Sequence, residues 1–307
     1  MPHPQVVENT ENQFPLPPSG LEFGDQLVAE LGTALHAVLD HSGVRFDDIN
    51  ARTSSVFVVG WNKQQWTQLP GEAAPYVGQA RKALTRLREF SACASQDAPD
   101  RLSELSELED AFERLIEQPG GTYPGGAPHS TIEKIRERLD QQLAEYPAIV
   151  RRLPCAHGLD QRLLVVDTSA LLDRPNLQDW TLDDQAWVVV FVPQVLSELD
   201  ERKRDPHTRD AAQKVIRQLE EFDRRGETTV GVPLAGKLTV REVAITPNMS
   251  QTLPWLHADT PDDLIIASAL ELRWEDLTSS IAIAASDRNV RNKARLAGLG
   301  VIRTTEL

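Results

Sequence analysis

The chain has 307 residues, a formal net charge of −14, a hydrophobic content of 40% and a charged content of 25%. These values are typical of a globular protein, and no apolar run approaches the roughly 20 residues that a membrane-spanning helix needs. The acidic excess argues against a tight nonspecific nucleic-acid binder, which needs a basic surface. Because most of the excess lies in the first half of the chain, it does not exclude a phosphate-backbone substrate.

Residues 1–20 are rich in Pro, Asn and Glu and have no basic cluster before an apolar stretch. We therefore expect a disordered tail rather than a signal peptide. The two cysteines are too few for a disulfide framework or a zinc site, which favours a cytoplasmic protein. Arginine far outnumbers lysine, which favours a bacterial source with a GC-rich genome.

The region 21–153 is predicted to be mostly helical. Leucines four residues apart between Leu27 and Leu39 indicate a first helix that ends near Gly43, and a short apolar run at 54–61 favours a strand. A Pro- and Gly-rich linker is expected at 119–129. No motif in this region carries recognisable chemistry. Further helical spacing is found at residues 76–94, 99–118 and 129–153.

The pattern of apolar residues changes in the second half of the chain. Continuous apolar runs rich in Val are typical of strands buried on both faces of a sheet. Such runs occupy residues 162–167 and 186–193; a third apolar run lies at 281–286 and a short fourth at 300–305. Helical segments lie between and beside them at residues 195–204, 210–225, 261–274 and 288–298. Alternating strands and helices predict an α/β domain over residues 160–307, with a parallel sheet flanked by helices.

Acidic residues recur at one predicted edge of this sheet. Asp167 and Asp287 end strands, Glu198 lies early in the helix after the second strand, and Asp262 and Asp263 open a helix. Ligands of such sheets bind at the carboxyl ends of the strands. Carboxylates gathered there repel one another unless a hard divalent cation relieves the repulsion, and Mg²⁺ or Mn²⁺ prefers oxygen ligands.

Each of these acids also has a purely structural explanation. Asp167 could cap its turn through Thr168 and Ser169, and Glu198 could pair with Arg202 one helical turn later. One of the two adjacent aspartates could serve only the dipole of its helix, and Asp287 could form a surface pair with Arg288. Four separate positions at one edge favour a shared functional site over four unrelated structural roles.

Four segments resemble, in order and spacing, the acidic motifs of the PIN domain family. They are VVDTSALL, VPQVLSELDERK, PDDLIIASAL and ASDRNVRNKA. The resemblance covers roughly residues 160–307 and is closer to the larger PIN domains than to the minimal toxin form. It implies a Mg²⁺- or Mn²⁺-dependent ribonuclease, in which an activated water attacks the scissile phosphorus in line.

The resemblance also implies roles for individual residues. Asp262 fits the third motif position better than Asp263, and the proton of the attacking water could pass to Glu198 or to Asp262. Ser169 would support the first acid, and Asn289 would contact substrate or support the site. The implied catalytic residues and metal ligands are Asp167, Glu198, Asp262 and Asp287, with Asp263 as a further candidate ligand.

Two basic groups flank the acids and have two interpretations each. They either form a solvated, mixed-charge face or hold phosphates on either side of the scissile one. The first group follows Glu198 and consists of Arg202, Lys203, Arg204 and Arg209. The second follows Asp287 and consists of Arg288, Arg291 and Lys293.

The leading hypothesis is a metal-dependent endoribonuclease with RNA as its substrate. A non-catalytic PIN-type binding or scaffold module is the alternative from another class. A DNA-directed nuclease of the flap type ranks lower because a long basic insertion is missing, and an Asp-x-Asp phosphatase is disfavoured by Ser169. PIN domains commonly pair, which favours a homodimer; a membrane partner is not expected, and nothing points to a particular protein inhibitor.

Overall fold

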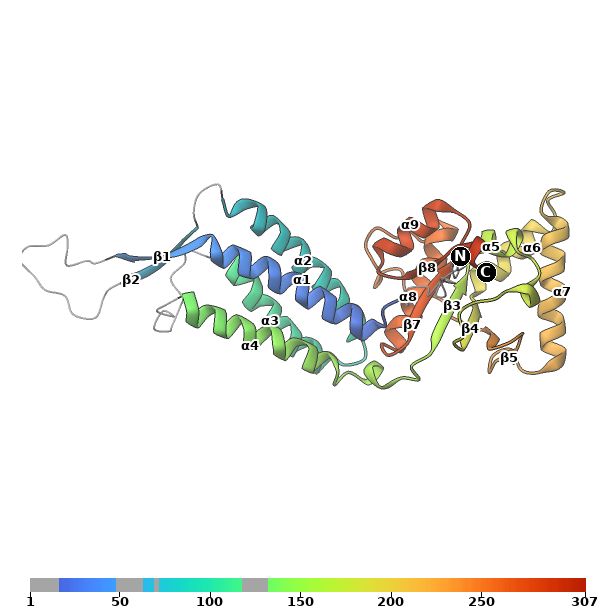
Figure 1. Cartoon of the computed structure of the whole chain (residues 1–307), viewed down its shortest axis with the longest axis horizontal. Coiled ribbons are helices and arrows are strands. Elements are labelled where there is room, and N and C mark those ends of the chain that lie inside the picture. Colours follow the sequence, from blue (N-terminus) through green and yellow to red (C-terminus); the bar gives the residue numbers. More distant parts are fainter. Residues whose placement is uncertain (1–16, 48–62, 69–71, 118–131) are drawn as a thin grey trace, which may run out of the picture. The chain divides into compact units, whose positions relative to one another are not determined.

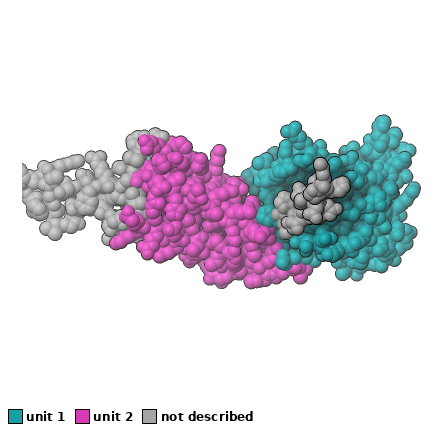
Figure 2. All heavy atoms as spheres, viewed as in Figure 1, with its two compact units in different colours: residues 1–18, 160–273, 279–307 teal, residues 19–159, 274–278 magenta. Residues whose placement is uncertain are grey.

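The computed structural model describes residues 17–47, 63–68, 72–117 and 132–307. They form two compact units, coloured separately in Figure 2. The helical unit comprises residues 19–159 and 274–278. The sheet unit comprises residues 160–273 and 279–307, together with Pro17 and Pro18. Within the described ranges, no helix is long and apolar enough to cross a membrane.

The helical unit confirms the predicted helical N-terminal region. Its first helix starts with a capping box, in which the Ser19 hydroxyl accepts the Glu22 amide and the Glu22 carboxylate accepts the Ser19 amide. The predicted leucine stripe is buried, because Leu31 and Leu35 are fully inaccessible to solvent. The helices are α1 (Gly20–Asp40), α2 (Ala74–Ala94), α3 (Pro99–Glu117) and α4 (Ile132–Val150).

A two-stranded antiparallel hairpin follows α1 and was not predicted. It pairs β1 (Ser42–Asp47) with β2 (Lys63–Gln68). The first helix therefore ends at Asp40, and Gly43, expected near the helix end, belongs to the hairpin. The predicted strand at 54–61, the linker at 119–129 and all but the last four residues of the predicted tail lie outside the described residues.

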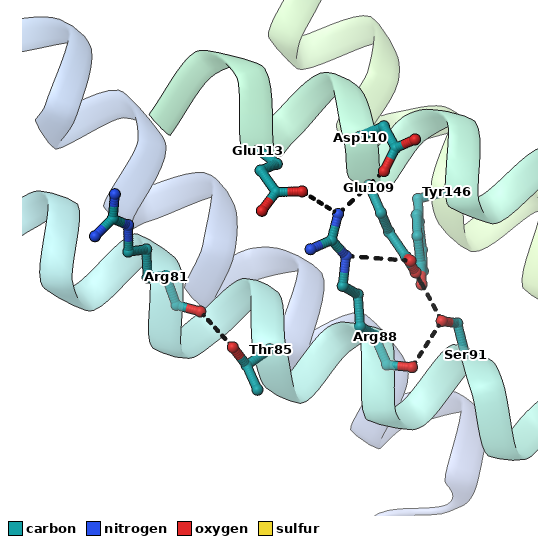
Figure 3. A network of polar contacts seen from close by, with 8 residues as sticks. All are labelled: Arg81, Thr85, Arg88, Ser91, Glu109, Asp110, Glu113 and Tyr146. Atoms are coloured by element: carbon teal, nitrogen blue, oxygen red, sulfur yellow. Dashed lines mark hydrogen bonds and ion pairs between the residues drawn. The ribbon is translucent and has the colours of Figure 1, made fainter. Parts of the chain in front are cut away.

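A buried carboxylate, Glu109 of α3, lies inside the helical unit (Figure 3). Its Oε1 accepts hydrogen bonds from the Ser91 and Tyr146 hydroxyls, each at 2.7 Å, and its Oε2 lies 3.8 Å from Arg88 Nε. Burial raises the pKa of Glu109, while these donors and Arg88 oppose the rise. The network thus satisfies a charge that the apolar core would otherwise exclude.

The sheet unit confirms the predicted α/β class. Six strands lie in the order β5-β6-β4-β3-β7-β8, and every neighbouring pair is parallel except β5 with β6. The central strands are buried on both faces, which explains their continuous apolar runs. The strands are β3 (Arg162–Val166), β4 (Trp187–Phe191), β5 (Val232–Pro233), β6 (Leu238–Glu242), β7 (Ser280–Ala284) and β8 (Gly300–Ile302).

The strands β5 and β6 were not predicted. In β6 only Leu238 and Val240 are buried and the other three side chains are half-buried, so this strand lacks the continuous apolar run of its neighbours. It nevertheless pairs in parallel with β4 over the whole of its length. The sheet is therefore wider than the four-stranded sheet expected from the apolar runs.

Helices connect and cover the strands. The short α5 (Thr168–Asp173), the helix α6 (Pro193–Arg202) and the long α7 (Arg209–Arg225) pack on one another, and α9 packs beside β8 (Figure 1). The remaining helix is α8 (Pro261–Glu275). The predicted helices appear within a few residues of their expected bounds, whereas α5 was not predicted.

The strand order determines where a ligand can bind. From β3 the sheet continues to β4 on one side and to β7 on the other, so the direction of winding changes at β3. At such a switch point, the connections that leave the carboxyl ends of neighbouring strands diverge and open a crevice. Asp167 and Asp287 lie just beyond the ends of β3 and β7, and Glu198 lies on α6, the helix that follows β4.

Candidate active site

Asp167 lies directly after β3 and is held in place by local hydrogen bonds. Its amide donates to the Ala284 carbonyl of β7 at 2.9 Å. Its carboxylate Oδ2 caps α5 by accepting the Ser169 amide at 3.1 Å and also accepts the Ser169 hydroxyl. Only 3% of Asp167 is exposed. A carboxylate at the tip of a buried strand is therefore both fixed and largely removed from water.

Ser169 connects Asp167 to the turn after β7. Its hydroxyl oxygen accepts the amides of Ser286 and Asp287, at 3.0 and 3.2 Å. The same hydroxyl donates to Asp167, so one side chain links two of the predicted acidic positions. Ser169 is thus joined to two residues that lie 117 and 118 positions later in the sequence, Ser286 and Asp287.

The other three acids come from three different helices. Glu198 of α6 is half-buried and accepts a hydrogen bond from Gln194 Nε2 at 3.0 Å. Asp262 is half-buried at the start of α8. Asp287 is exposed and caps α9, because its Oδ1 accepts the amides of the two residues that open the helix after Arg288.

The four carboxylates influence one another electrostatically. Burial, aided by the nearby charges of Glu198 and Asp262, raises the pKa of Asp167 to about 6, although the bonds from Ser169 oppose this rise. The pKa of Asp262 is also raised, first by burial and then by Asp287 and Glu198. Asp167 is therefore coupled to Glu198 and Asp262, and Asp262 to Glu198 and Asp287, so that the four acids form one connected group.

Asp263 is placed differently from its neighbour. It is fully buried, and its Oδ1 forms an ion pair with Lys293 Nζ. Its Oδ2 accepts the His257 amide at 3.1 Å. Both oxygens are thus engaged by the protein, whereas Asp262 lies among the other acids.

The donor chemistry of the four acids suits a hard divalent cation. All four offer carboxylate oxygens, and their mutual repulsion is the condition that Mg²⁺ or Mn²⁺ relieves. In the side-chain arrangement of the described ranges, no three His, Cys, Asp or Glu residues stand close enough to hold a metal ion together. The fit therefore rests on the donor set and its electrostatic coupling.

The predicted nucleic-acid contacts differ in how far their side chains are engaged. Arg291 donates through one guanidinium nitrogen to the carbonyls of Ala285 and Ser286 at the end of β7. Lys203 pairs with Asp200 at 2.6 Å. The remaining members are exposed to solvent: Arg202, Arg204, Arg209, Arg288 and Asn289.

Sequence reasoning missed one carboxylate beside the site. Asp173, at the end of α5, accepts hydrogen bonds from the Ser286 hydroxyl and from the Thr304 hydroxyl, the latter at 3.0 Å. It therefore holds Ser286, in the turn between β7 and Asp287, through a hydrogen bond to the Ser286 hydroxyl. No local pattern marks Asp173, because its partners lie more than 110 positions away in the sequence.

Comparison with known proteins agrees with this geometry. A sequence profile described as PIN domain matches residues 164–305. Among curated proteins, none shows significant similarity to the chain. The matched range contains β4 to β8, all but the first two residues of β3, and all four coupled acids. Residues 164–305 are thus a PIN domain, of a family of typically metal-dependent nucleases, preceded here by an additional helical N-terminal region.

Proposed function

We propose that this PIN domain is a metal-dependent endoribonuclease. The observation that carries the proposal is the electrostatic coupling of Asp167, Glu198, Asp262 and Asp287, which come from four separate segments. A fold gains no stability from gathering like charges at a half-buried edge. Their collection at the switch point of the sheet therefore favours a role in binding a cation and a phosphate substrate.

In the proposed reaction, the residues that would hold Mg²⁺ or Mn²⁺ are Asp167, Glu198, Asp262 and Asp287. When bound, such an ion polarises the phosphoryl oxygen and lowers the pKa of water. Asp167 presents a fixed carboxylate because both hydrogen bonds from Ser169 reach Oδ2; within the described residues, none reaches Oδ1. The proton of the attacking water passes to Glu198 or Asp262, the two half-buried acids.

The first test is cleavage of a panel of RNA and single-stranded DNA, labelled at either end, with Mg²⁺, Mn²⁺ or EDTA. We expect internal cuts in RNA that require the divalent ion and are lost in Asp167→Asn. The matched control is Asp184→Asn, because Asp184 is an exposed aspartate ahead of β4, at the amino end of the strands. Loss of activity in both variants would point to a nonspecific effect of the substitution.

The same panel separates the alternatives. Cleavage restricted to DNA would replace RNA by DNA as the substrate. RNA cleavage that Asp167→Asn leaves unchanged would remove the four-acid site from the proposal. Binding of RNA without any cleavage, together with no stabilisation by divalent ions, would replace the nuclease by a binding module. Pairing of two chains is a separate proposal, which sedimentation of the full chain over a range of concentrations tests directly.

A further inference from the structure

Lys293 is a cation held at a fixed place beside the acidic site. It lies on α9, and its Nζ forms an ion pair with Asp263 Oδ1 of α8, 30 positions away in the sequence. The Asp263 side chain is 1% exposed, whereas the Lys293 side chain is 24% exposed. The pair therefore joins a buried anion to a cation that still reaches solvent.

Asp263 orients Lys293 rather than taking part in the acidic cluster itself. Its second oxygen accepts the His257 amide, so the carboxylate cannot rotate away without losing a partly buried hydrogen bond. A lysine ammonium has three N–H donors. Within the described part of the chain, one of those donors is used by Asp263, which leaves two for a ligand.

The ion pair is not the only tie between α8 and α9. Arg273, fully buried on α8, donates to the carbonyls of Ala297 and Gly298 just beyond α9, at 3.3 and 2.6 Å. This second connection already anchors the end of α9. A purely architectural role therefore does not account for a lysine that keeps a quarter of its side chain in solvent.

The charge of Lys293 acts on the site. It lowers the pKa of Asp262, against the effects of burial and of the other acids. The ammonium therefore lies within electrostatic reach of the proposed metal-binding carboxylates. By contrast, Arg291 on the same helix is engaged by backbone carbonyls.

We propose that Lys293, oriented by Asp263, binds a non-bridging phosphate oxygen of the RNA strand beside the scissile phosphate. This inference rests on the proposed nuclease function and adds a substrate contact to it. An ammonium tethered by a buried carboxylate is pre-organised, so little side-chain entropy is lost when the strand binds. The contact positions the backbone and carries no base specificity.

The experiment measures affinity for a single-stranded RNA at several salt concentrations, with Ca²⁺ in place of Mg²⁺, and cleavage with Mg²⁺ in parallel. The main variant combines Lys293→Met with Asp263→Asn. It removes the cation without leaving a buried unpaired carboxylate and keeps the net charge of the protein unchanged. Lys293→Arg keeps the cation, and Lys237→Met removes a lysine that precedes β6 at the opposite edge of the sheet.

Each phosphate contact on a single strand contributes about 0.7 to the slope of log affinity against log salt. We expect the slope of log affinity against log salt to be smaller by about 0.7 in the double variant than in the wild type. The ratio of wild-type affinity to variant affinity should therefore fall about 2.6-fold between roughly 50 and 200 mM salt. Lys293→Arg should keep the wild-type slope, and Lys237→Met should leave both slope and cleavage unchanged. A merely structural ion pair would not alter the slope.

The outcomes distinguish this inference from the function on which it rests. If the wild type binds and cuts RNA while the double variant keeps the wild-type slope, Lys293 is not a phosphate contact and the nuclease stands. If the wild type binds RNA without cutting it, the slope still tests Lys293 on the binding surface. If the wild type neither binds nor cuts RNA, both proposals are overturned.

Discussion

Asp167→Asn is expected to stabilise the metal-free sheet unit while it abolishes cleavage. Asp167 is 3% exposed, and burial is the main reason why its pKa rises from 3.8 to about 6. Its ionised form is therefore disfavoured in the folded state. Asparagine removes this charge and can still present one oxygen to the Ser169 amide and hydroxyl. The difference in unfolding free energy between variant and wild type therefore measures what it costs to bury the charge of Asp167.

The size and sign of the effect follow from linkage. Because the folded-state pKa is raised, the folded protein binds the proton more tightly than the unfolded chain, and ionisation destabilises it as pH rises from about 4 to 6. The full difference between pKa 3.8 and about 6 corresponds to about 3 kcal/mol. In EDTA, Asp167→Asn should therefore gain about 3 kcal/mol over wild type near pH 7.5, but only about 1 kcal/mol near pH 4.5.

Native-state hydrogen exchange of the β3 and β7 amides measures this difference within the sheet unit alone. Comparison of the variant with the wild type at the same pH cancels the intrinsic exchange rate. Near pH 7.5 the variant should exchange on the order of a hundredfold more slowly. Equal protection in the two proteins, or a gain that does not depend on pH, would refute the claim that Asp167 is a destabilising buried charge.

Three further predictions concern the same features. Mg²⁺ at about 100 times its dissociation constant should stabilise the wild type by about 2.7 kcal/mol, seen as a rise in Tm that Asp167→Asn largely lacks; an equal rise in both would place the ion elsewhere. Ser169→Ala should lower metal affinity or kcat by about 10- to 100-fold, because it frees Asp167 and the turn before Asp287, and unchanged kinetics would contradict this. Tyr146→Phe should destabilise the helical unit by about 1–3 kcal/mol in urea unfolding, because buried Glu109 loses a hydrogen-bond donor; a neutral effect would show that Ser91 and Arg88 suffice.

Local patterns were enough to identify the main elements. Continuous apolar runs marked β3, β4 and β7, because a strand covered on both faces must be apolar at nearly every position, and a shorter run marked β8. The same reasoning failed for β6, whose half-buried side chains do not form such a run. Its assignment depends on pairing with β4, which is a contact between distant parts of the chain.

The hairpin of β1 and β2 was missed for a related reason. Its antiparallel register matches Ser42 with Gln68 and Asp47 with Lys63, so it is defined by backbone pairing across a long connection. Neither strand carries a run of apolar residues that would announce it. Periodicity of apolar residues identifies elements that bury side chains. It is a weak guide to an element that is defined by backbone hydrogen bonds to a distant segment.

The sequence by itself determined the α/β class and the family resemblance and predicted four acids as candidate site residues, because strand ends and motif spacing are local properties. The resemblance already favoured Asp262 over Asp263 as the third acid, but only the tertiary structure shows what each side chain contacts. The two are adjacent in sequence, yet one lies among the other acids and the other is buried against Lys293. Successive residues at a helix start point in different directions, about 100° apart around its axis. Asp263 pairs with Lys293 of α9, whereas Asp262 lies among the other acids. This difference depends on α9, a helix that only folding brings next to the start of α8.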